Sequence, residues 1–542
     1  MRNGIFGRTV VVAGALHLNQ DSAQRSDLNG EIMMSGGLMT VSGGSSTSIW
    51  SANANTRIQM SAGTLDFRTS SINIVNSDFA FVESITGGTI RTVGNFICQR
   101  SNFRPTVGFV ELYGPGVAYV SIHPQSFLQG LAVNKSGRGE AGTSDERDEP
   151  NVRTNQVYLI SPLHLRNALL VSSGVFDLNN NALRVDGPMG VHGTLLMNSP
   201  SDNLYVKRAI TFHEGSIGQI THGTVEAGNW FIIEEDANFQ MAANTTLRFW
   251  GLGSGANTFN YAKIDNYATG TRFGNLVVDK PDLANLIIQS PTPLIVQGNF
   301  NIQNQSNVEF NHCDMTITGS LTLNNGSKLA ILDYSTLNVN GATSISDELI
   351  VGSYSELICN STFSLPSQGS MKIYDESIVK LARAYAGVYF SFTGNVTLYE
   401  DAILEITHNG LQIGTAANIQ VNTGTIKIGW AFRAMSPNTF NGGAGQVELF
   451  GARSGQIEMH STNSFYDLVI NKPGISYAVM QVSQVVANRD IIIQGGNLTP
   501  LNNILRTLRD LRIEGGRLTL ATGSVMQVCR NWINTAGTAA FD

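Results

Sequence analysis

Hydrophobic and polar residues alternate along most of this chain in short runs. The clearest runs lie between residues 294 and 428, where turns such as Asn-Gly, Gly-Ser and Asp-Glu separate them; they are residues 321–323, 337–339, 371–373 and 396–398. Alternation with a period of two, bounded by turn residues, is typical of strands with one buried face. Helical periodicity is nearly absent, so the pattern predicts an all-β protein.

The spacing of the strands predicts how the chain coils. Gly298, Gly319 and Gly341 follow equivalent strands at separations of 21 and 22 residues. A turn of about 22 residues with about three short strands is one coil of a parallel β-helix, whose inward residues stack on those of neighbouring coils. Parallel crossover connections are right-handed because strands twist in one sense. We therefore predict a right-handed parallel β-helix, or β-solenoid, with about 20 to 25 residues per coil.

A longer repeat is superimposed on these coils. Its phrases are G-T-[IV], an aromatic residue, a Phe, then V-E-L-[YF]-G or a close variant, and finally F-x-x-L-x-[IV]-N-K, which begins at Phe127, Phe273 and Phe465 with some variation. The repeat predicts the following division: plain coils in 1–87, three modules with their coils in 88–222, 223–423 and 424–531, and the start of a fourth module in 532–542. Both ends read as interrupted solenoid, so we interpret the chain as a piece of a longer secreted protein.

The modules share apolar residues that are expected in the core, since buried aromatic side chains contribute strongly to core stability. Two sets are predicted to occupy equivalent inward positions: Phe103, Phe239 and Phe440, and Leu131, Leu276 and Leu468. Further core residues are expected in the third module, namely Trp430, Leu449, Phe450 and Phe465.

Composition fits a solenoid and excludes other classes. Charged residues make up 14% of the 542 residues, against about 25% in ordinary globular chains. The 56 glycines suit a chain with many turns. The net charge of −7, without a basic stripe, argues against a nucleic-acid partner. No run reaches the roughly 18 apolar residues of a membrane helix, so we expect no membrane insertion.

Cysteine spacing gives no metal or redox motif. The four cysteines are scattered and form no C-x-x-C pair; they are Cys98, Cys313, Cys359 and Cys529. We expect four buried or half-buried thiols, with a disulfide only if the stacking of coils brings Cys313 next to Cys359.

The order of the repeated phrases resembles repeat modules of very large surface and secreted proteins of Bacteroidetes and related bacteria. The resemblance covers most of the chain from Gly88 onward, while residues 1–87 share only the general coil pattern. It implies a right-handed parallel β-helix, an adhesin-like role, export by type IX secretion and a location outside the cell or on its surface.

One pair of segments is a candidate for catalytic or metal-binding chemistry. In some parallel β-helix enzymes, acids on adjacent coils hold calcium or act as acid and base. Here a 25-residue offset would place four carboxylates on neighbouring coils: Asp375, Glu376, Glu400 and Asp401. Candidate bases lie nearby at Lys372, Lys380 and Arg383. The alternative, which we favour, is that these acids lie in solvated turns. The acidic run 145–149 lies in a polar insertion, and we interpret it as a solvated loop in the same way. We therefore assign no catalytic, cofactor or metal residue.

Two function classes stay open. The first is a non-catalytic structural or adhesive segment of a bacterial surface or extracellular fibrous protein. Its partners would be other segments of the same chain, copies of itself joined end to end, or surface glycans. The second is a carbohydrate-active enzyme of the lyase or glycoside hydrolase type, or a glycan-binding module. We expect the first, because a spacer tolerates variable coil numbers, whereas an active site needs one fixed constellation.

Overall fold

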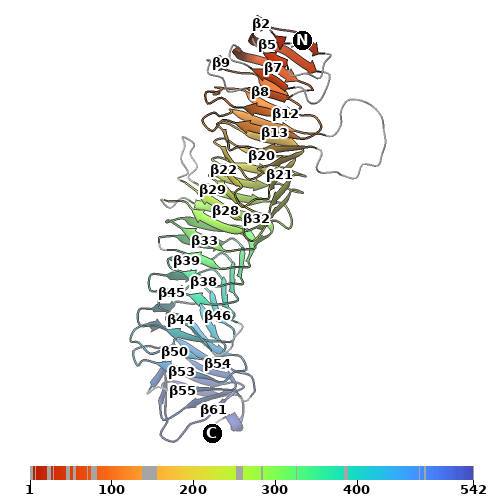
Figure 1. Ribbon diagram of the computed structural model, residues 1–542. Coiled ribbons are helices and arrows are strands. Elements are labelled where there is room, and N and C mark those ends of the chain that lie inside the picture. Colours follow the sequence, from red (N-terminus) through yellow and green to blue (C-terminus); the bar gives the residue numbers. More distant parts are fainter. Residues whose placement is uncertain are drawn as a thin grey trace, which may run out of the picture. The chain divides into compact units, whose positions relative to one another are not determined.

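The computed structural model describes residues 4–5, 8–20, 26–28, 30–43, 49–52, 57–69, 71–74, 82–136, 155–251, 261–281, 285–324, 326–383, 388–474, 476–480 and 484–540. It divides into two compact units. Unit 1 comprises Met1–Trp250 and Lys263–Gly274, and unit 2 comprises Gly251–Ala262 and Asn275–Asp542. Within each unit short strands stack in successive coils (Figure 1). The only helix among the described residues is the 3-10 turn η1 (Thr538–Ala540).

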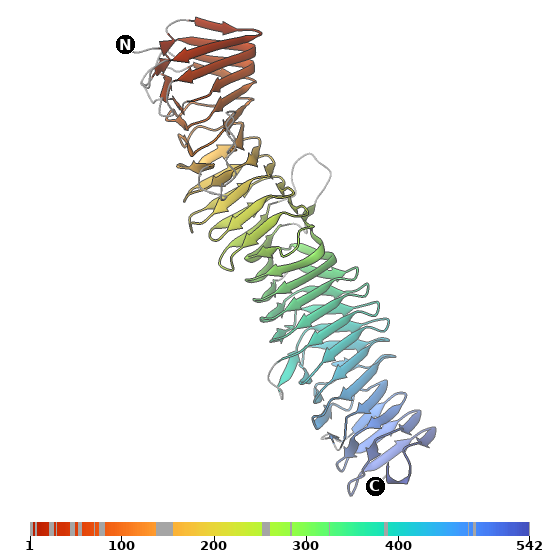
Figure 2. The same ribbon diagram turned by 90° about the vertical axis from the view of Figure 1, so that its right-hand side faces the viewer.

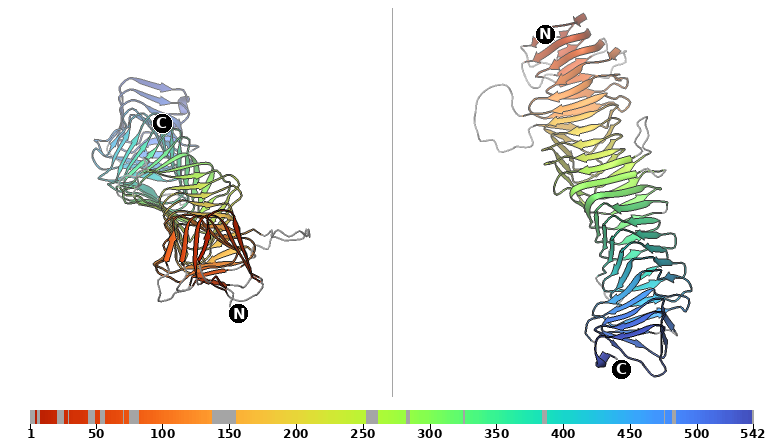
Figure 3. Two further views of the ribbon diagram at one scale, coloured as in Figure 1. Left: turned by 90° about the horizontal axis from the view of Figure 1, so that it is seen from above. Right: turned by 180° about the vertical axis from the view of Figure 1, so that it is seen from behind.

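The strands of unit 1 stand in three columns (Figure 3). The first column contains β3 (Ala15–Gln20), β5 (Glu31–Gly43), β7 (Arg57–Phe67), β10 (Thr89–Thr92), β12 (Phe109–Tyr113), β14 (Gly130–Asn134), β17 (Leu169–Ser173), β20 (Met189–Val191), β23 (Ile210–Phe212), β26 (Trp230–Ile233) and β29 (Tyr261–Asn266). The second contains β1 (Gly4–Ile5), β4 (Ser26–Leu28), β6 (Ile49–Ala52), β8 (Ser71–Ile74), β11 (Phe96–Cys98), β13 (Ala118–Ile122), β15 (Gln156–Leu159), β18 (Val175–Asp177), β21 (Thr194–Met197), β24 (Ile217–Ile220), β27 (Asn238–Met241) and β30 (Arg272–Phe273). The third contains β2 (Arg8–Val11), the first halves of β5 and β7, β9 (Val82–Ile85), β16 (Leu163–Leu165), β19 (Ala182–Val185), β22 (Asn203–Val206), β25 (Thr224–Ala227) and β28 (Thr246–Trp250).

Unit 2 repeats this plan (Figure 2). Its first column contains β32 (Asn285–Val296), β34 (Asn307–Ile317), β36 (Lys328–Leu332), β39 (Glu348–Val351), β42 (Ser370–Ile373), β45 (Asn395–Leu398), β48 (Asn418–Val421), β51 (Phe440–Asn441), β56 (Gln484–Ala487), β59 (Ile504–Thr507) and β62 (Val525–Val528). The second contains the last parts of β32 and β34, β37 (Thr336–Val339), β40 (Glu356–Cys359), β43 (Ile378–Leu381), β46 (Ile403–Ile406), β49 (Thr425–Ile428), β52 (Gln446–Phe450), β54 (Asp467–Asn471), β57 (Ile491–Gly495), β60 (Asp510–Ile513) and β63 (Asn531–Asn534). The third contains β31 (Asn275–Asp279), β33 (Phe300–Gln303), β35 (Leu321–Leu323), β38 (Thr343–Ile345), β41 (Phe363–Ser364), β44 (Tyr389–Phe392), β47 (Gly410–Ile413), β50 (Phe432–Ala434), β53 (Gly455–Met459), β55 (Tyr477–Met480), β58 (Asn497–Pro500) and β61 (Arg517–Leu518).

The pairing between coils is parallel and in register. Thr336 pairs with Glu356, and Glu356 pairs with Ile378, so the coils here are 20 and 22 residues long. The next coil, from Ile378 to Ile403, has 25 residues. These lengths fall in the predicted range. The predicted parallel β-helix is confirmed.

Alternation along each strand builds the core. In β37 the inward residues are Leu337 and Val339, and in β40 they are Leu357 and Cys359; all four are fully buried. The residues between them face outward, because successive side chains in a strand point to opposite faces. Register pairing therefore places the inward residues of one strand on the inward residues of the next, along the interior of each unit.

The three glycines that define the coil length form one column of turns. The N–H of Gly319 donates to the carbonyl of Gly298 at 3.0 Å, and the N–H of Gly341 donates to the carbonyl of Gly319 at 2.9 Å. A Cβ atom on Gly319 would lie 2.4 Å from the oxygen of Gly298. Glycine is therefore required at this corner by the close approach of one backbone to the next.

The predicted inward placement of both sets is confirmed. The phenylalanines Phe103, Phe239 and Phe440 are 0%, 1% and 3% exposed, and the leucines are fully buried: Leu131, Leu276 and Leu468. Their equivalence around the coil is not confirmed, because within unit 2 Leu276 lies in β31 of the third column and Leu468 in β54 of the second. Phe465 also contacts Phe440, with 5.6 Å between ring centroids.

Two predicted core residues of the third module were wrong. Trp430 and Phe450 are only half-buried. Phe450 follows the inward residue Leu449 in β52, so strand alternation turns it outward. The aromatic residue that enters the core near Trp430 is Phe432, whose ring centroid is 5.0 Å from that of Phe440. The prediction therefore placed the inward aromatic residue two positions too early, at Trp430 instead of Phe432.

Each module also buries a lysine. Lys135, Lys280 and Lys472 end the N-K or D-K phrase, and all three are at most 1% exposed. The ammonium group of Lys135 donates to the carbonyl of Val93 at 2.5 Å, and that of Lys472 donates to the carbonyl of Arg453 at 2.7 Å. Burial lowers the pKa of each ammonium group to about 8. The lysine of the repeated phrase is thus a structural bridge to backbone carbonyls of preceding segments.

The cysteines do not form disulfides. Cys98, Cys313 and Cys359 are buried free thiols, whereas Cys529 is exposed, contrary to the prediction that all four are at least half-buried. Burial raises the pKa of both Cys313 and Cys359 to about 12. Stacking of coils does not join these two residues, and the Cys359 sulfur instead accepts a hydrogen bond from the hydroxyl of Thr343 at 3.4 Å.

Candidate functional site

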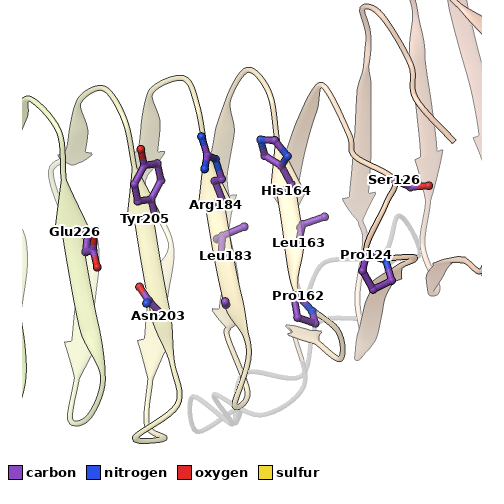
Figure 4. A pocket seen from close by; sticks show the side chains of 11 residues that line it. Pro124, Ser126, Pro162, Leu163, His164, Leu183, Arg184, Asn203, Tyr205 and Glu226 are labelled. Atoms are coloured by element: carbon purple, nitrogen blue, oxygen red, sulfur yellow. The ribbon is translucent and has the colours of Figure 1, made fainter. Parts of the chain in front are cut away.

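The outer face of unit 1 carries a hollow of about 330 Å³ over the strands β16, β19, β22 and β25. Register pairing aligns one outward residue from each strand: His164 with Arg184, Arg184 with Tyr205, and Tyr205 with Glu226. Figure 4 shows His164, Arg184 and Tyr205 side by side on successive strands. We call this surface the β16–β25 groove.

The depth of the groove comes from a change in side-chain size. Ala182 is exposed and pairs with Asn203 on the next coil. Its methyl group leaves space that a longer outward side chain would fill. Pro124 and Pro162 provide apolar surface at the same end of the groove (Figure 4), and the buried Leu183 lies beneath.

A carboxylate beside the groove pairs its two basic side chains. Asp186 lies 2.7 Å from His164 Nε2 and accepts a hydrogen bond from Arg184 Nε at 2.9 Å. Partial burial opposes ionisation of Asp186, but the hydrogen bonds from His164 and Arg184 outweigh it and hold the pKa of this carboxyl below its usual value. Arg184 is therefore held in one orientation at the edge of the hollow.

The aromatic wall of the groove is also held in place. The ring of Tyr205 lies 4.7 Å from that of Trp250, centroid to centroid, and the two planes make an angle of 34°. The guanidinium carbon of Arg184 lies 4.8 Å from the centroid of the same Tyr205 ring. Burial raises the pKa of Tyr205, so its phenol is neutral at physiological pH. Arg184 comes from the preceding coil and Trp250 from a later one, so the two cover opposite faces of the ring. The half-buried Tyr205 thus presents its ring edge and its hydroxyl group to the groove.

The four predicted candidate acids lie elsewhere, at two stacked turns of unit 2. Asp375 and Glu376 join β42 to β43, and Glu400 and Asp401 join β45 to β46. All four have positive φ angles, between 34° and 55°. The N–H of Glu376 donates to the carbonyl of Glu400 at 3.1 Å. The predicted 25-residue offset thus does bring these residues onto neighbouring coils.

The chemistry of these turns is modest. A hydrogen bond and repulsion from Asp375 raise the pKa of the fully exposed Glu400. Among the described residues, no group of three or more acidic, histidine or cysteine side chains has the arrangement of a metal site. Asp is one of the residues that tolerate φ > 0 in turns, which accounts for Asp375 and Asp401 without a ligand.

The predicted candidate bases near these acids are occupied by other partners. Lys372 Nζ lies 2.7 Å from Glu348, and Lys380 Nζ lies 2.6 Å from Glu356. Hydrogen bonds to these carboxylates raise the pKa of both lysines, which opposes a role as a proton acceptor at neutral pH. The structure shows no contact of Arg383 with the acids. The acidic run 145–149 lies outside the described residues.

The β16–β25 groove was missed by the sequence analysis. Its residues occur once per coil, 20 or 21 positions apart, so a search for outward residues at the coil spacing would have placed His164, Arg184, Tyr205 and Glu226 in one row. The hollow itself depends on Ala182 and on the packing of Tyr205 against Trp250. Neither can be read from a short motif.

Comparison with known proteins gives no relative from which a role can be transferred. No protein-family model, curated protein or solved structure matches this chain. Within the part of the chain that the structure describes, no helix is long and apolar enough to cross a membrane.

Proposed function

We propose that this chain is a non-catalytic structural and adhesive segment of a large bacterial cell-surface or extracellular fibrous protein. In this role the solenoid keeps its coils in fixed register and presents its outer faces to glycans of the surroundings. The resemblance of its repeated phrases to modules of such proteins supports the location.

The observation that carries the structural role is a set of side chains that join successive coils. In unit 2 the carboxylate of Asp467 accepts the backbone N–H of Asp490 at 3.1 Å, and that of Asp490 accepts the N–H of Asp510 at 3.2 Å. Asp510 in turn accepts the N–H of Asn531 at 3.2 Å. Charge-assisted hydrogen bonds of this kind are stronger than neutral ones. They fix the register of each coil on the next, which suits a structural segment.

The parallel pairing of strands between coils also supports the proposed partners. β60 and β63 pair in parallel from Asp510 with Asn531 to Ile513 with Asn534, in the same manner as the earlier coils. Another segment of the chain, or a second copy placed end to end, would pair by the same pattern of backbone hydrogen bonds.

A lyase or glycoside hydrolase is the second candidate, because Asp375 and Glu400 do interact across adjacent coils. The ion pairs of Lys372 and Lys380 weigh against it. The test is to incubate the purified chain, with calcium, with a panel of neutral and acidic polysaccharides and to measure new reducing ends and unsaturated products. We expect neither. Product formation that disappears in the Asp375→Asn, Asp401→Asn double variant would replace the proposed function by the lyase.

A further inference from the structure

We propose that the β16–β25 groove binds a neutral oligosaccharide, with pyranose rings lying across successive coils over Ala182 and against Tyr205. This inference rests on the adhesive part of the proposed function and names its ligand and its site.

The size and lining of the groove suit a sugar. Its volume of about 330 Å³ is at the lower end of the roughly 300–1,000 Å³ of small-molecule sites. One face of a pyranose ring presents C–H groups, which pack on apolar surface, while its hydroxyl groups need donors and acceptors at the edges. Pro162, Leu163 and Ala182 supply apolar surface. Tyr205, Asn203 and Glu226 supply a phenol hydroxyl, an amide and a carboxylate beside it.

The site is prepared before a ligand arrives. Trp250 packs against Tyr205, and Arg184 lies over the same ring while Asp186 holds its guanidinium group. A ligand therefore does not have to order these long side chains, which would otherwise lower its affinity.

The charges around the groove favour a neutral ligand over an anionic one. Arg184 and His164 both contact Asp186, and this carboxylate compensates the charge of Arg184 at the edge of the groove. Glu226 adds an acidic group at the other end of the groove. A polyanion would find no excess of positive charge here, whereas hydroxyl groups can both accept from Arg184 and donate to Glu226.

The spacing of the coils is similar to the spacing of the sugar units in an oligosaccharide. Neighbouring strands lie about 4.8 Å apart, a distance similar to the length of one pyranose unit. His164, Arg184, Tyr205 and Glu226 thus offer one side chain per sugar to a chain that crosses the four strands. We therefore expect affinity to increase with the number of sugar units up to about four.

The test is calorimetric titration of the full chain with neutral hexasaccharides of glucose, mannose, galactose and xylose. At least one is expected to bind. Ala182→Leu fills the hollow from an exposed strand position and should weaken that binding at least tenfold. Ala342→Leu is the control, because Ala342 is an exposed alanine beside β38 of unit 2, and it should leave binding unchanged.

Three results would overturn the inference: no binding of any neutral hexasaccharide, equal binding by the Ala182→Leu variant, or binding only of an acidic polysaccharide or an extended peptide. Each leaves the proposed structural role intact if no polysaccharide is cleaved. Cleavage of a polysaccharide would instead contradict the proposed function, whatever the groove binds.

Discussion

The backbone N–H of Ser335 donates a hydrogen bond to the hydroxyl oxygen of Ser355, one coil further along, at 3.1 Å. Both serines are buried, and the relationship repeats: Cys313 N–H donates to Ser335 at 3.1 Å, and Ser355 N–H donates to Ser377 at 3.0 Å. The serines thus satisfy buried backbone donors at a corner where the strands end.

Ser355→Ala should destabilise the chain by about 1–3 kcal/mol, because it leaves the buried N–H of Ser335 without its acceptor. Denaturant unfolding followed by circular dichroism would measure the change. Ser344→Ala is the control, since Ser344 is half-buried on the outward face of β38. Equal effects of the two substitutions would contradict this role for the serine column.

Gly319→Ala should also destabilise the fold. Its Cβ atom would lie 2.4 Å from the carbonyl oxygen of Gly298, so one coil would have to shift relative to the next. Gly352→Ala provides the comparison, because a Cβ atom there makes only ordinary contacts of 3.5 Å or more. A lower melting temperature is expected for the first variant than for the second. The same melting temperature for both would show that the corner can relax.

The coil and its core could be predicted from the sequence because they depend on local signals. Alternation in strands such as β37 and the spacing of Gly298, Gly319 and Gly341 determine the coil length and the inward face. The error at Trp430 arose because a repeated phrase does not reveal which residue of an aromatic pair turns inward. The error at Phe450 arose because the adjacent residues Leu449 and Phe450 of one strand were both assigned to the core, although strand alternation turns only one of them inward. The β16–β25 groove depends on register across four coils and on the small Ala182, which no local pattern displays.

The stability of the chain should rise with pH between about 8 and 10.5 through its three buried lysines. Burial lowers the pKa of Lys472 to about 8 in the folded chain, from an ordinary 10.5. In this window the unfolded chain binds the proton and the folded chain does not, so increasing pH favours folding. The contribution is on the order of 3 kcal/mol per lysine over the whole window.

The free energy of unfolding, measured from pH 7 to pH 10.5, tests this effect. Lys472→Met should reduce the rise, since one of the groups that titrate is lost. Lys380→Met is the control: a hydrogen bond to Glu356 raises the pKa of Lys380, so its stabilising contribution is lost only above the ordinary pKa. An unchanged pH dependence in Lys472→Met would mean that the folded lysine does not titrate in this window.

Two phenylalanines of the third module should respond differently to truncation. Phe440 packs against Phe432 and Phe465 at 5.0 and 5.6 Å and is 3% exposed. Phe440→Ala should therefore cost about 3–5 kcal/mol. Phe450 is half-buried on the outer face, so Phe450→Ala should cost clearly less. Urea unfolding of both variants measures the difference, and a larger loss for Phe450 would contradict the assignment of the core.

The most direct test of the account is one NMR time course of the full chain mixed with the neutral hexasaccharide that it binds most tightly. We expect saturation transfer from the protein to the sugar protons, weakened by Ala182→Leu, while the integrals of the anomeric signals stay constant for days. Binding without turnover is what an adhesive scaffold does. New anomeric signals from shorter sugars, growing with time and with protein concentration, would show that the chain is an enzyme and would contradict the account.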